Sequence, residues 1–311
     1  MIEWNDHVTL PEMRIETHFD GRQFPCFVQR PPSFYAMWAD AVQQRPDHEA
    51  ISFNDQRWSY AQADAEIDRI ARGFAERGIR QGERVVMFIS NRPEFVFVLF
   101  ALQKLGVISV PVGTREQGPG LAYIVNQCGA SGIVFDDNLA DRIPDASTSP
   151  GLRVRVCTGA ATTTGDALSS LDGANVDIAQ CNEEDCACIL YTSGTTGNPK
   201  GAMLTHLNIA HSVIHYEVSM KLGKDDRGAL AVPASHVTGL IALIAEMVYV
   251  KGTLIIIAEF KAADFVPLIA KERISFSLMV PAMYQLCLLQ DSFTRLDLST
   301  WRVGEIGRAH V

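Results

Sequence analysis

The stretch YTSGTTGNPKG, residues 191–201, combines hydroxyl side chains, flexible glycines and one cation directly after a short apolar run, CACILY at 186–191. Such a run is typical of a strand in a parallel sheet that is covered on both faces. Gly194 and Gly197 allow backbone conformations closed to other residues and let main-chain N–H groups approach a ligand. Lys200 adds a positive charge, and hydroxyl donors that suit phosphate oxygens come from Thr192, Ser193, Thr195 and Thr196. The stretch therefore predicts a strand followed by a loop that binds a polyphosphate.

This loop differs from a Walker A loop, in which Gly-x-x-x-x-Gly-Lys is followed by Ser or Thr and the helix starts at the lysine. Here the two glycines are three residues apart, Pro199 precedes Lys200, and Gly201 follows it. The next helix is expected to begin near Thr205, too late for its N-terminus to hold the phosphate as a P-loop helix does. The alternative interpretation is a Gly- and Thr-rich surface turn without a ligand.

The longer stretch YTSGTTGNPKGAMLTHLN, which begins at Tyr191, resembles the signature loop of the adenylate-forming superfamily. That superfamily contains acyl- and aryl-CoA synthetases, the adenylation domains of peptide synthetases, and luciferases. Residues 82–112, GERVVMFISNRPEFVFVLFALQKLGVISVPV, resemble the strand, helix and strand that begin its large domain. Residues 232–240, VPASHVTGL, resemble the segment that lines its acyl pocket. The resemblance covers about residues 34–304, and it implies the layered α/β large domain of these enzymes, incomplete at the C-terminus.

The pattern along the chain independently predicts an α/β fold with largely parallel sheets, in which ligand sites lie at the carboxyl ends of strands. Residues 1–33 are interpreted as an irregular lead-in, residues 50–53 and 57–58 as a hairpin, and residues 160–173 as a surface loop. Strands are expected at 85–89, 107–112, 132–135, 154–157, 186–191, 229–232, 253–257 and 276–280. Helices are expected at 33–44, 60–77, 93–105, 121–128, 207–217, 239–250, 262–272 and 281–289.

Composition excludes several classes of protein. With 311 residues, 47% of them hydrophobic, the chain can bury one large core or two modest ones. The net charge of −9 and the lack of a block rich in Lys and Arg count against nucleic-acid binding. The most apolar segments are interrupted by Gln103 and Lys104, or by Glu246 and Lys251, before they reach the length of a membrane span. The N-terminus lacks the pattern of a signal peptide, so a cytoplasmic protein is expected.

Seven cysteines without regular spacing favour a reducing compartment. Three of them, Cys181, Cys186 and Cys188, lie close together and raise the alternative of a metal site. Because Cys186 and Cys188 alternate along the predicted strand, they are expected to share one face, without the spacing of a Cys-x-x-Cys pair. We interpret them as small buried thiols.

The resemblance implies ATP-dependent activation of a carboxylic acid, fatty or aromatic, to an acyl-adenylate, followed by thioester formation with CoA. It implies Mg²⁺ and ATP at the loop, with the β- and γ-phosphates held by Thr192, Ser193, Gly194, Thr195, Thr196, Gly197 and Lys200. The resemblance also implies that the Thr195 hydroxyl approaches the magnesium ion and that Lys200 neutralises the departing pyrophosphate. These two are the candidate catalytic residues. A solvated lysine is the alternative for Lys200.

His236 is the second residue that the resemblance singles out. In acyl- and aryl-CoA synthetases the matching position lies near the acyl carboxylate, whereas peptide-synthetase domains usually have Phe-Asp at this step. This chain has Ser-His-Val-Thr-Gly at 235–239, so it resembles an acid ligase more than an amino-acid activator. The candidate acid-binding residues are therefore His236, Thr238 and Gly239. The alternative is a histidine with a purely structural role.

Other parts that the superfamily requires do not occur in residues 1–311. They are a Tyr-Gly-x-Thr-Glu turn, an aspartate for the ribose, a hinge, and a C-terminal domain with a lysine. The last residues, EIGRAHV at 305–311, match the translation of a widely used DNA-sequencing adapter, so we expect a tail that is not native. Two function classes stay open: the large-domain part of an acid–thiol ligase, inactive by itself, or a non-catalytic fragment that binds a nucleotide or acyl group. Adenylation without CoA transfer is a further alternative.

Overall fold

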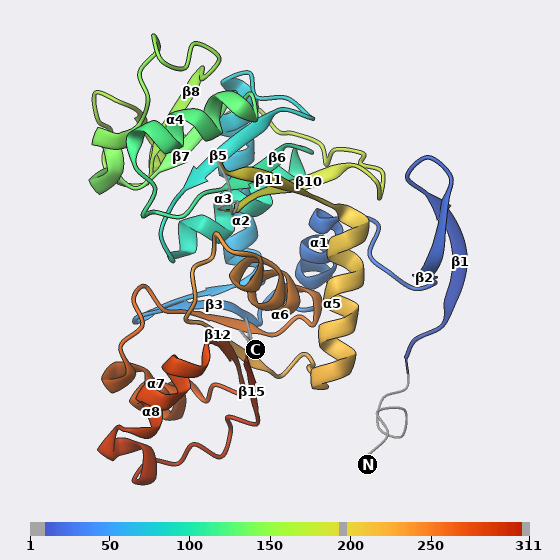
Figure 1. The fold of residues 1–311 in the computed structure, drawn as a ribbon, viewed down its shortest axis with the longest axis vertical. Helices are drawn as coiled ribbons and strands as arrows, with labels where there is room; N and C mark the ends of the chain where they lie inside the picture. Colours follow the sequence, from blue (N-terminus) through green and yellow to red (C-terminus); the bar gives the residue numbers. More distant parts are fainter. Residues whose placement is uncertain (1–9, 193–197, 307–311) are drawn as a thin grey trace.

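The computed structural model describes residues 10–192 and 198–306. Two mainly parallel sheets lie one above the other, with helices between them and on their outer faces (Figure 1). This arrangement confirms the α/β fold with largely parallel sheets that the sequence predicts.

The first sheet has seven strands in the order β11-β10-β6-β5-β7-β8-β9. Its neighbouring strands run parallel except β10 and β11, which form an antiparallel pair. The strands are β5 (Arg84–Phe88), β6 (Ile108–Pro111), β7 (Gly132–Phe135), β8 (Val154–Cys157), β9 (Asp166–Ala167), β10 (Cys186–Thr192) and β11 (Lys200–Thr205). The sequence did not predict β9 or β11, which are short or exposed strands at the two edges of the sheet.

The second sheet has six strands in the order β15-β14-β12-β13-β3-β4. It is parallel except for the β3–β4 hairpin at one edge, which the sequence predicts. The strands are β3 (Glu49–Phe53), β4 (Gln56–Ser59), β12 (Arg227–Leu230), β13 (Thr253–Ile256), β14 (Phe276–Met279) and β15 (Val303–Ile306). Glu305 and Ile306 pair with β14, and the remainder of the expected non-native tail lies outside the described residues.

The largest core lies between the two sheets, where helices pack on the inner face of each. Bulky side chains fill it, among them Phe34, Trp38, Tyr60, Phe74 and Phe100. The outer faces are covered by α4 on the seven-stranded sheet and by α7 and α8 on the six-stranded sheet. The helices are α1 (Phe34–Gln44), α2 (Tyr60–Glu76), α3 (Pro93–Lys104), α4 (Gly118–Gln127), α5 (His206–Met220), α6 (Glu246–Tyr249), α7 (Ala262–Glu272) and α8 (Pro281–Leu288).

Helix α2 shows why local signals predict these elements well. The Ser59 hydroxyl accepts from the Gln62 N–H, and the Gln62 side chain accepts from the Ser59 N–H, so the expected capping box is present. One apolar stripe of the helix is fully buried, as its period predicts. Gly78, with φ of +78°, ends the helix in a backbone conformation that favours glycine.

The expected α-helix at 239–250 is instead two elements. A π-helix covers Thr238–Ala245, and α6 continues it from Glu246. All residues from Gly239 to Ala245 are buried and apolar. Because no polar residue interrupts this segment, the sequence shows no hydrophobic repeat from which the type of helix could be predicted. π-Helical turns are frequent at functional sites, and this one begins two residues after His236.

The interpretation of residues 1–33 as irregular is wrong for part of the segment. Strands β1 (Met13–His18) and β2 (Arg22–Phe27) form an antiparallel hairpin that stands beside the main body (Figure 1). Pro25 lies inside β2 and argues against a strand in the sequence. Tertiary contacts hold the hairpin, because Arg30 donates to Glu16 at 2.6 Å and to Glu183 at 2.7 Å. Phe27 packs against two histidine rings of α5.

The segment 160–173 is also less irregular than expected. It contains β9 and a short 3₁₀-helix, Leu168–Ser170, whose Leu168 is buried together with Leu171. Arg69 of α2 donates to the carbonyl oxygens of both leucines. The segment is thus fixed to the body by packing that its small and polar sequence does not reveal.

Candidate functional site

The Thr- and Gly-rich loop connects two antiparallel strands. β10 ends at Thr192, β11 begins at Lys200, and these two residues are paired across the hairpin. Helix α5 begins only after β11, with Thr205 as its N-cap, which confirms the expected start of the helix. The hairpin geometry separates this loop from a P-loop, since a strand and not a helix follows it. Ser193, Gly194, Thr195, Thr196 and Gly197 lie outside the described residues.

Close packing at the base of this hairpin explains one of its glycines. A Cβ atom at Gly201 would lie 2.6 Å from Ile189 Cγ2 and 3.2 Å from the Tyr191 ring. The Tyr191 hydroxyl donates to the Gln127 side chain on α4. Burial raises the pKa of Tyr191 to about 12, so the phenol keeps its proton at neutral pH. The root of the loop is therefore fixed by contacts to the sheet and to α4.

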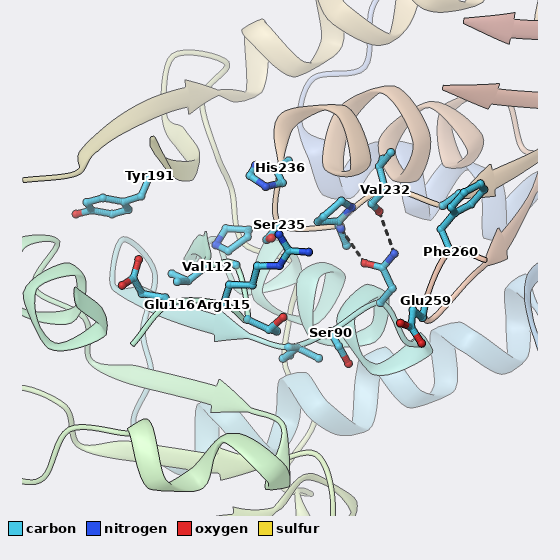
Figure 2. A pocket seen from close by; sticks show the side chains of 18 of the residues that line it. Ser90, Val112, Arg115, Glu116, Tyr191, Val232, Ser235, His236, Glu259 and Phe260 are labelled. Atoms are coloured by element: carbon cyan, nitrogen blue, oxygen red, sulfur yellow. Dashed lines mark hydrogen bonds between the residues drawn. The ribbon is translucent and has the colours of Figure 1, made fainter. Parts of the chain in front are cut away.

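A cavity of about 930 Å³ lies where the carboxyl ends of both sheets meet (Figure 2). The seven-stranded sheet contributes residues that follow β5 and β6 and residues at the end of β10. The six-stranded sheet contributes residues that follow β12, β13 and β14. The lining includes Ser90, Asn91, Gly113, Arg115, Glu116, Tyr191, Thr192, Pro199, Val232, Ser235, His236, Glu259 and Phe260. This is the position that the α/β architecture predicts for a ligand site.

The predicted site residues divide into three groups by position. Thr192 and His236 line the cavity from opposite sheets, and Pro199 beside Lys200 lines it as well. Lys200 itself is exposed at the start of β11, outside the cavity lining. Thr238 and Gly239 belong to the π-helix behind the wall and do not line the cavity.

Gly239 has a packing reason to be glycine. A Cβ atom there would lie 2.3 Å from the Pro233 carbonyl oxygen. The close approach lets the chain turn from the wall segment 232–236 into the helix, and Leu240 N–H donates to the His236 carbonyl at 2.8 Å. Gly239 therefore supports the wall from behind, which differs from the contact with the acid that the resemblance implies.

Several residues that line the cavity were not predicted as site residues from the sequence. Arg115 and Glu116 follow β6, Asn91 follows β5, and Glu259 follows β13. Figure 2 shows Arg115 and His236 at the cavity from different walls. Each missed residue comes a few positions after a predicted strand, so the rule of carboxyl ends could have found them if it had been applied to every strand.

The cysteine interpretation needs one correction. A register shift in the β10–β11 pairing lies between Cys186 and Cys188, so the two do not simply share one face of a regular strand. Cys188 is buried, and burial raises the pKa of the half-buried Cys186 thiol to about 11. Buried thiols of this kind behave as small apolar groups.

One group of metal-ligand atoms within 4.8 Å of one another occurs among residues 10–192 and 198–306, formed by Glu16, His18 and Cys26 in the N-terminal hairpin. Arg30 donates to both oxygens of Glu16, so this carboxylate is part of an ion pair. Mg²⁺ prefers oxygen ligands and does not suit a thiol and an imidazole. Thr195, the magnesium ligand that the resemblance implies, lies outside the described residues.

The family model described as AMP-binding enzyme matches residues 38–310. The chain belongs to this family. Feruloyl-CoA synthase of Amycolatopsis sp is 29% identical over 86% of this chain and 52% of its own length. The long-chain-fatty-acid–CoA ligase FadD13 of Mycobacterium tuberculosis is 31% identical over 82% of this chain and 50% of its own length. This member of the AMP-binding enzyme family thus spans about half the length of these curated relatives.

A solved structure gives the same picture of the fold. The inhibitor-bound N-terminal domain of FACL13 from Mycobacterium tuberculosis superposes with a TM-score of 0.81 at 27% identity, covering 89% of this chain and 70% of that one. The AMP-binding chain therefore has the fold of the N-terminal domain of acyl-CoA ligases. Among the helices that the structure describes, none has the length and apolar character needed to cross a bilayer.

Proposed function

We propose that the full-length protein activates a carboxylic acid with ATP to form an acyl-adenylate and then transfers the acyl group to CoA. One observation carries this proposal: the phosphate-type hairpin and the segment with His236 border the same cavity at the carboxyl ends of two sheets. The described ends of the hairpin, Thr192 and Pro199, and the mainly apolar wall at 232–236 line this one cavity, which supports a single ligand that contacts both.

The chemistry explains why both parts are needed. A carboxylate is anionic and has no good leaving group, so a thiol does not attack it at neutral pH. Transfer of AMP from ATP gives a mixed anhydride with a good leaving group and releases pyrophosphate. Such transfers are catalysed mainly by positioning and by neutralisation of charge.

We assign the triphosphate to the hairpin loop, with Thr192, Ser193, Gly194, Thr195, Thr196 and Gly197 as donors of hydrogen bonds. Lys200 provides charge for the departing pyrophosphate from the start of β11. The Thr195 hydroxyl would help to hold Mg²⁺, which would neutralise charge on the phosphates. Lys200 lies outside the cavity lining, so its action requires that the loop and the triphosphate approach each other.

The acid is assigned to the wall at 232–236, with His236 near its carboxylate. Thr238 and Gly239 contribute by supporting this wall from the π-helix. Two relatives are named for a feruloyl and for a long-chain fatty acyl substrate, and a cavity of about 930 Å³ lies in the size range of small-molecule sites. Fatty and aromatic acids are therefore the first substrates to test.

The test uses the full-length protein and two readouts. Exchange of pyrophosphate into ATP is expected only when a suitable acid is present, and formation of a thioester only when CoA is then added. Pyrophosphate exchange without thioester formation would support the alternative function, adenylation without transfer to CoA. No acid-dependent exchange with any fatty or aromatic acid would contradict the enzyme and favour a non-catalytic protein that binds a nucleotide or an acyl group.

A further inference from the structure

Asn91, in the turn between β5 and α3, connects the two sheets at the cavity. Its side-chain nitrogen donates to the carbonyl oxygens of Val232 at 2.9 Å, Ile257 at 3.2 Å and Leu230 at 3.3 Å. Its side-chain oxygen accepts from the Ala234 N–H at 2.8 Å. One side chain of the seven-stranded sheet thus holds the end of β12 and the chain just beyond β12 and β13 of the six-stranded sheet.

The polarity of these contacts requires an amide. Three carbonyl oxygens surround the nitrogen, and one N–H group faces the oxygen, so the orientation of the amide is determined by its partners. A carboxylate at this position would face three carbonyl oxygens without a proton to share. An apolar side chain would leave the partner groups of the main chain without their hydrogen bonds, which is costly where water is excluded.

The turn that carries Asn91 is itself fixed on its other side. Asp136, which follows β7 and is 4% exposed, accepts from the Ser90 N–H at 2.8 Å and from Arg92 at 3.3 Å. The Thr158 hydroxyl, which follows β8, donates to the same carboxylate at 2.9 Å. Three neighbouring strands of the seven-stranded sheet therefore hold the turn, and the position of Asn91 is set before it meets the second sheet.

The held segment is the wall of the cavity. Val232 and Ala234 both line the cavity. His236 lies two residues after Ala234 in the same turn, in which the His236 N–H donates to the Pro233 carbonyl at 3.2 Å. A shift of Ala234 would therefore move His236. A displacement of about 1 Å at a reacting group can change a rate about a hundredfold.

We propose that Asn91 is a positioning residue, which places the acid-binding wall at 232–236 relative to the sheet that carries the phosphate loop. This inference rests on the proposed function for the identity of the ligand at that wall. Asn91 acts through the backbone of the wall segment.

The test compares Asn91→Ala and Asn91→Asp with Ser59→Ala in the full-length protein. Asn91→Asp keeps the acceptor for the Ala234 N–H and loses the donor, so it isolates the contacts to the three carbonyl oxygens. Ser59→Ala removes the cap of α2, away from the cavity lining, and controls for a general loss of stability. Both Asn91 variants should raise the KM for the acid about tenfold or more and leave the KM for ATP within about twofold, while Ser59→Ala changes neither.

Two further measurements separate positioning from general destabilisation. Asn91→Ala combined with His236→Ala should lose less acid specificity than the sum of the single variants, because both act on one wall. Amide hydrogen exchange of residues 231–236 should accelerate in Asn91→Ala and not in Ser59→Ala. Equal rises in both KM values, additive effects, or unchanged exchange in the wall would each overturn the proposal. If the wild-type protein activates no acid, the proposed function fails, and the exchange experiment still decides whether Asn91 holds the wall.

Discussion

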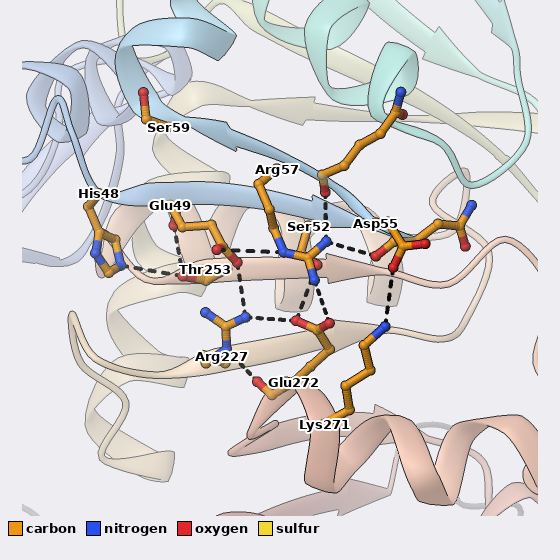
Figure 3. Close-up of polar contacts among 12 residues, drawn as sticks. His48, Glu49, Ser52, Asp55, Arg57, Ser59, Arg227, Thr253, Lys271 and Glu272 are labelled. Carbon is orange, nitrogen blue, oxygen red and sulfur yellow. Dashed lines mark hydrogen bonds and ion pairs between the residues drawn. The ribbon is translucent and has the colours of Figure 1, made fainter.

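The two ends of the six-stranded sheet differ in how far their ion pairs are buried. Near the amino ends of the strands, Arg227 pairs with Glu49 at 2.9 Å and with Glu272 at 3.1 Å, and Arg57 of β4 pairs with Glu272 at 2.6 Å (Figure 3). At the carboxyl ends, the cavity residue Glu259, which follows β13, pairs with Lys261 at 3.0 Å, and the two side chains are 75% and 61% exposed.

The difference indicates that the charged groups at the amino ends stabilise the fold, whereas those at the cavity can contact a ligand. A buried carboxylate such as Glu272, which is 5% exposed, is tolerated only because guanidinium groups surround it. Charges and main-chain groups that end at a cavity stay available to a bound molecule. Changes at the amino ends should therefore alter stability, and changes near the cavity should alter catalysis.

The largest effect is expected for Glu272→Ala. It removes one of the two carboxylates that Arg57 and Arg227 share, leaving only Glu49, and it removes a contact to the Ser52 hydroxyl. The free energy of unfolding should fall by about 2–4 kcal/mol, below the loss for a fully buried pair, because both arginines are partly exposed. Urea unfolding of the full-length protein measures this loss.

The adjacent pair Lys271–Asp55 provides a matched control. Its two side chains are 59% and 96% exposed, so Lys271→Ala should change the free energy of unfolding by about 0.5 kcal/mol or less. Neither variant should change the KM for ATP or for the acid once the protein is folded. A Glu272→Ala protein of normal stability with impaired kinetics would break the distinction between the two ends.

Next in size is the effect of Lys200→Ala or Thr195→Ala at the hairpin loop. Each variant should slow adenylate formation by about one to three decades, the range for losing one group that stabilises developing charge, with the fold intact. Pyrophosphate exchange by the full-length protein gives the rate, and a melting curve checks the fold. Normal rates in both variants would show that this loop does not handle ATP.

The elements that local sequence signals predict best are those buried on both faces. Strands β7 and β8 occur at the predicted residues, because apolar runs bounded by turn residues leave little freedom in register. Helix α7, which buries one face, also occurs at its predicted residues. The missed strands lie in the separate N-terminal hairpin, β1 and β2, or at sheet edges, β9, β11 and β15. They depend on a partner strand or an ion pair, as the hairpin depends on Arg30. Such long-range pairing is absent from local periodicity.

The site follows the same rule. The Thr- and Gly-rich loop and His236 stand out in the sequence because each belongs to a recognisable stretch. Asn91 and Arg115 do not, since their role depends on which strand ends come together in space. Parallel topology places all these residues at one edge, but the sequence alone does not say that Asn91 reaches Val232 in the other sheet.

A smaller effect is expected at Glu246, a second buried carboxyl group that contrasts with Glu272. Both of its oxygens are buried without a hydrogen-bond partner among the described residues. Burial raises the pKa of Glu246 well above its ordinary value, and Glu217 and Asp226 raise it further. The group should thus be protonated in the folded protein at a pH where the unfolded chain has lost the proton.

Unfolding then releases a proton, so the stability of the wild-type protein should fall as the pH rises above the unfolded pKa of 4.5 and until the raised folded pKa is reached. Glu246→Gln cannot ionise and should remove this fall, with a gain of about 1–2 kcal/mol at neutral pH and little gain in acid. Urea unfolding across this pH range measures both proteins. A constant difference between them at every pH would mean that Glu246 is not protonated by burial.

The smallest effect is expected for His236→Ala, which tests the cavity end of the sheet directly. If His236 lies against the acid, its loss should change the preference between fatty and aromatic acids by about three- to tenfold, as for a modest change in a binding pocket. The apparent affinity for ATP should change less, because the triphosphate is assigned to the opposite wall. Pyrophosphate exchange with a panel of acids gives both quantities.

Val237→Ala is the matched control, since Val237 is the next residue, is 54% exposed and does not line the cavity. An equal loss for every acid, together with a lower melting temperature, would make His236 a structural residue and move the acid elsewhere in the cavity.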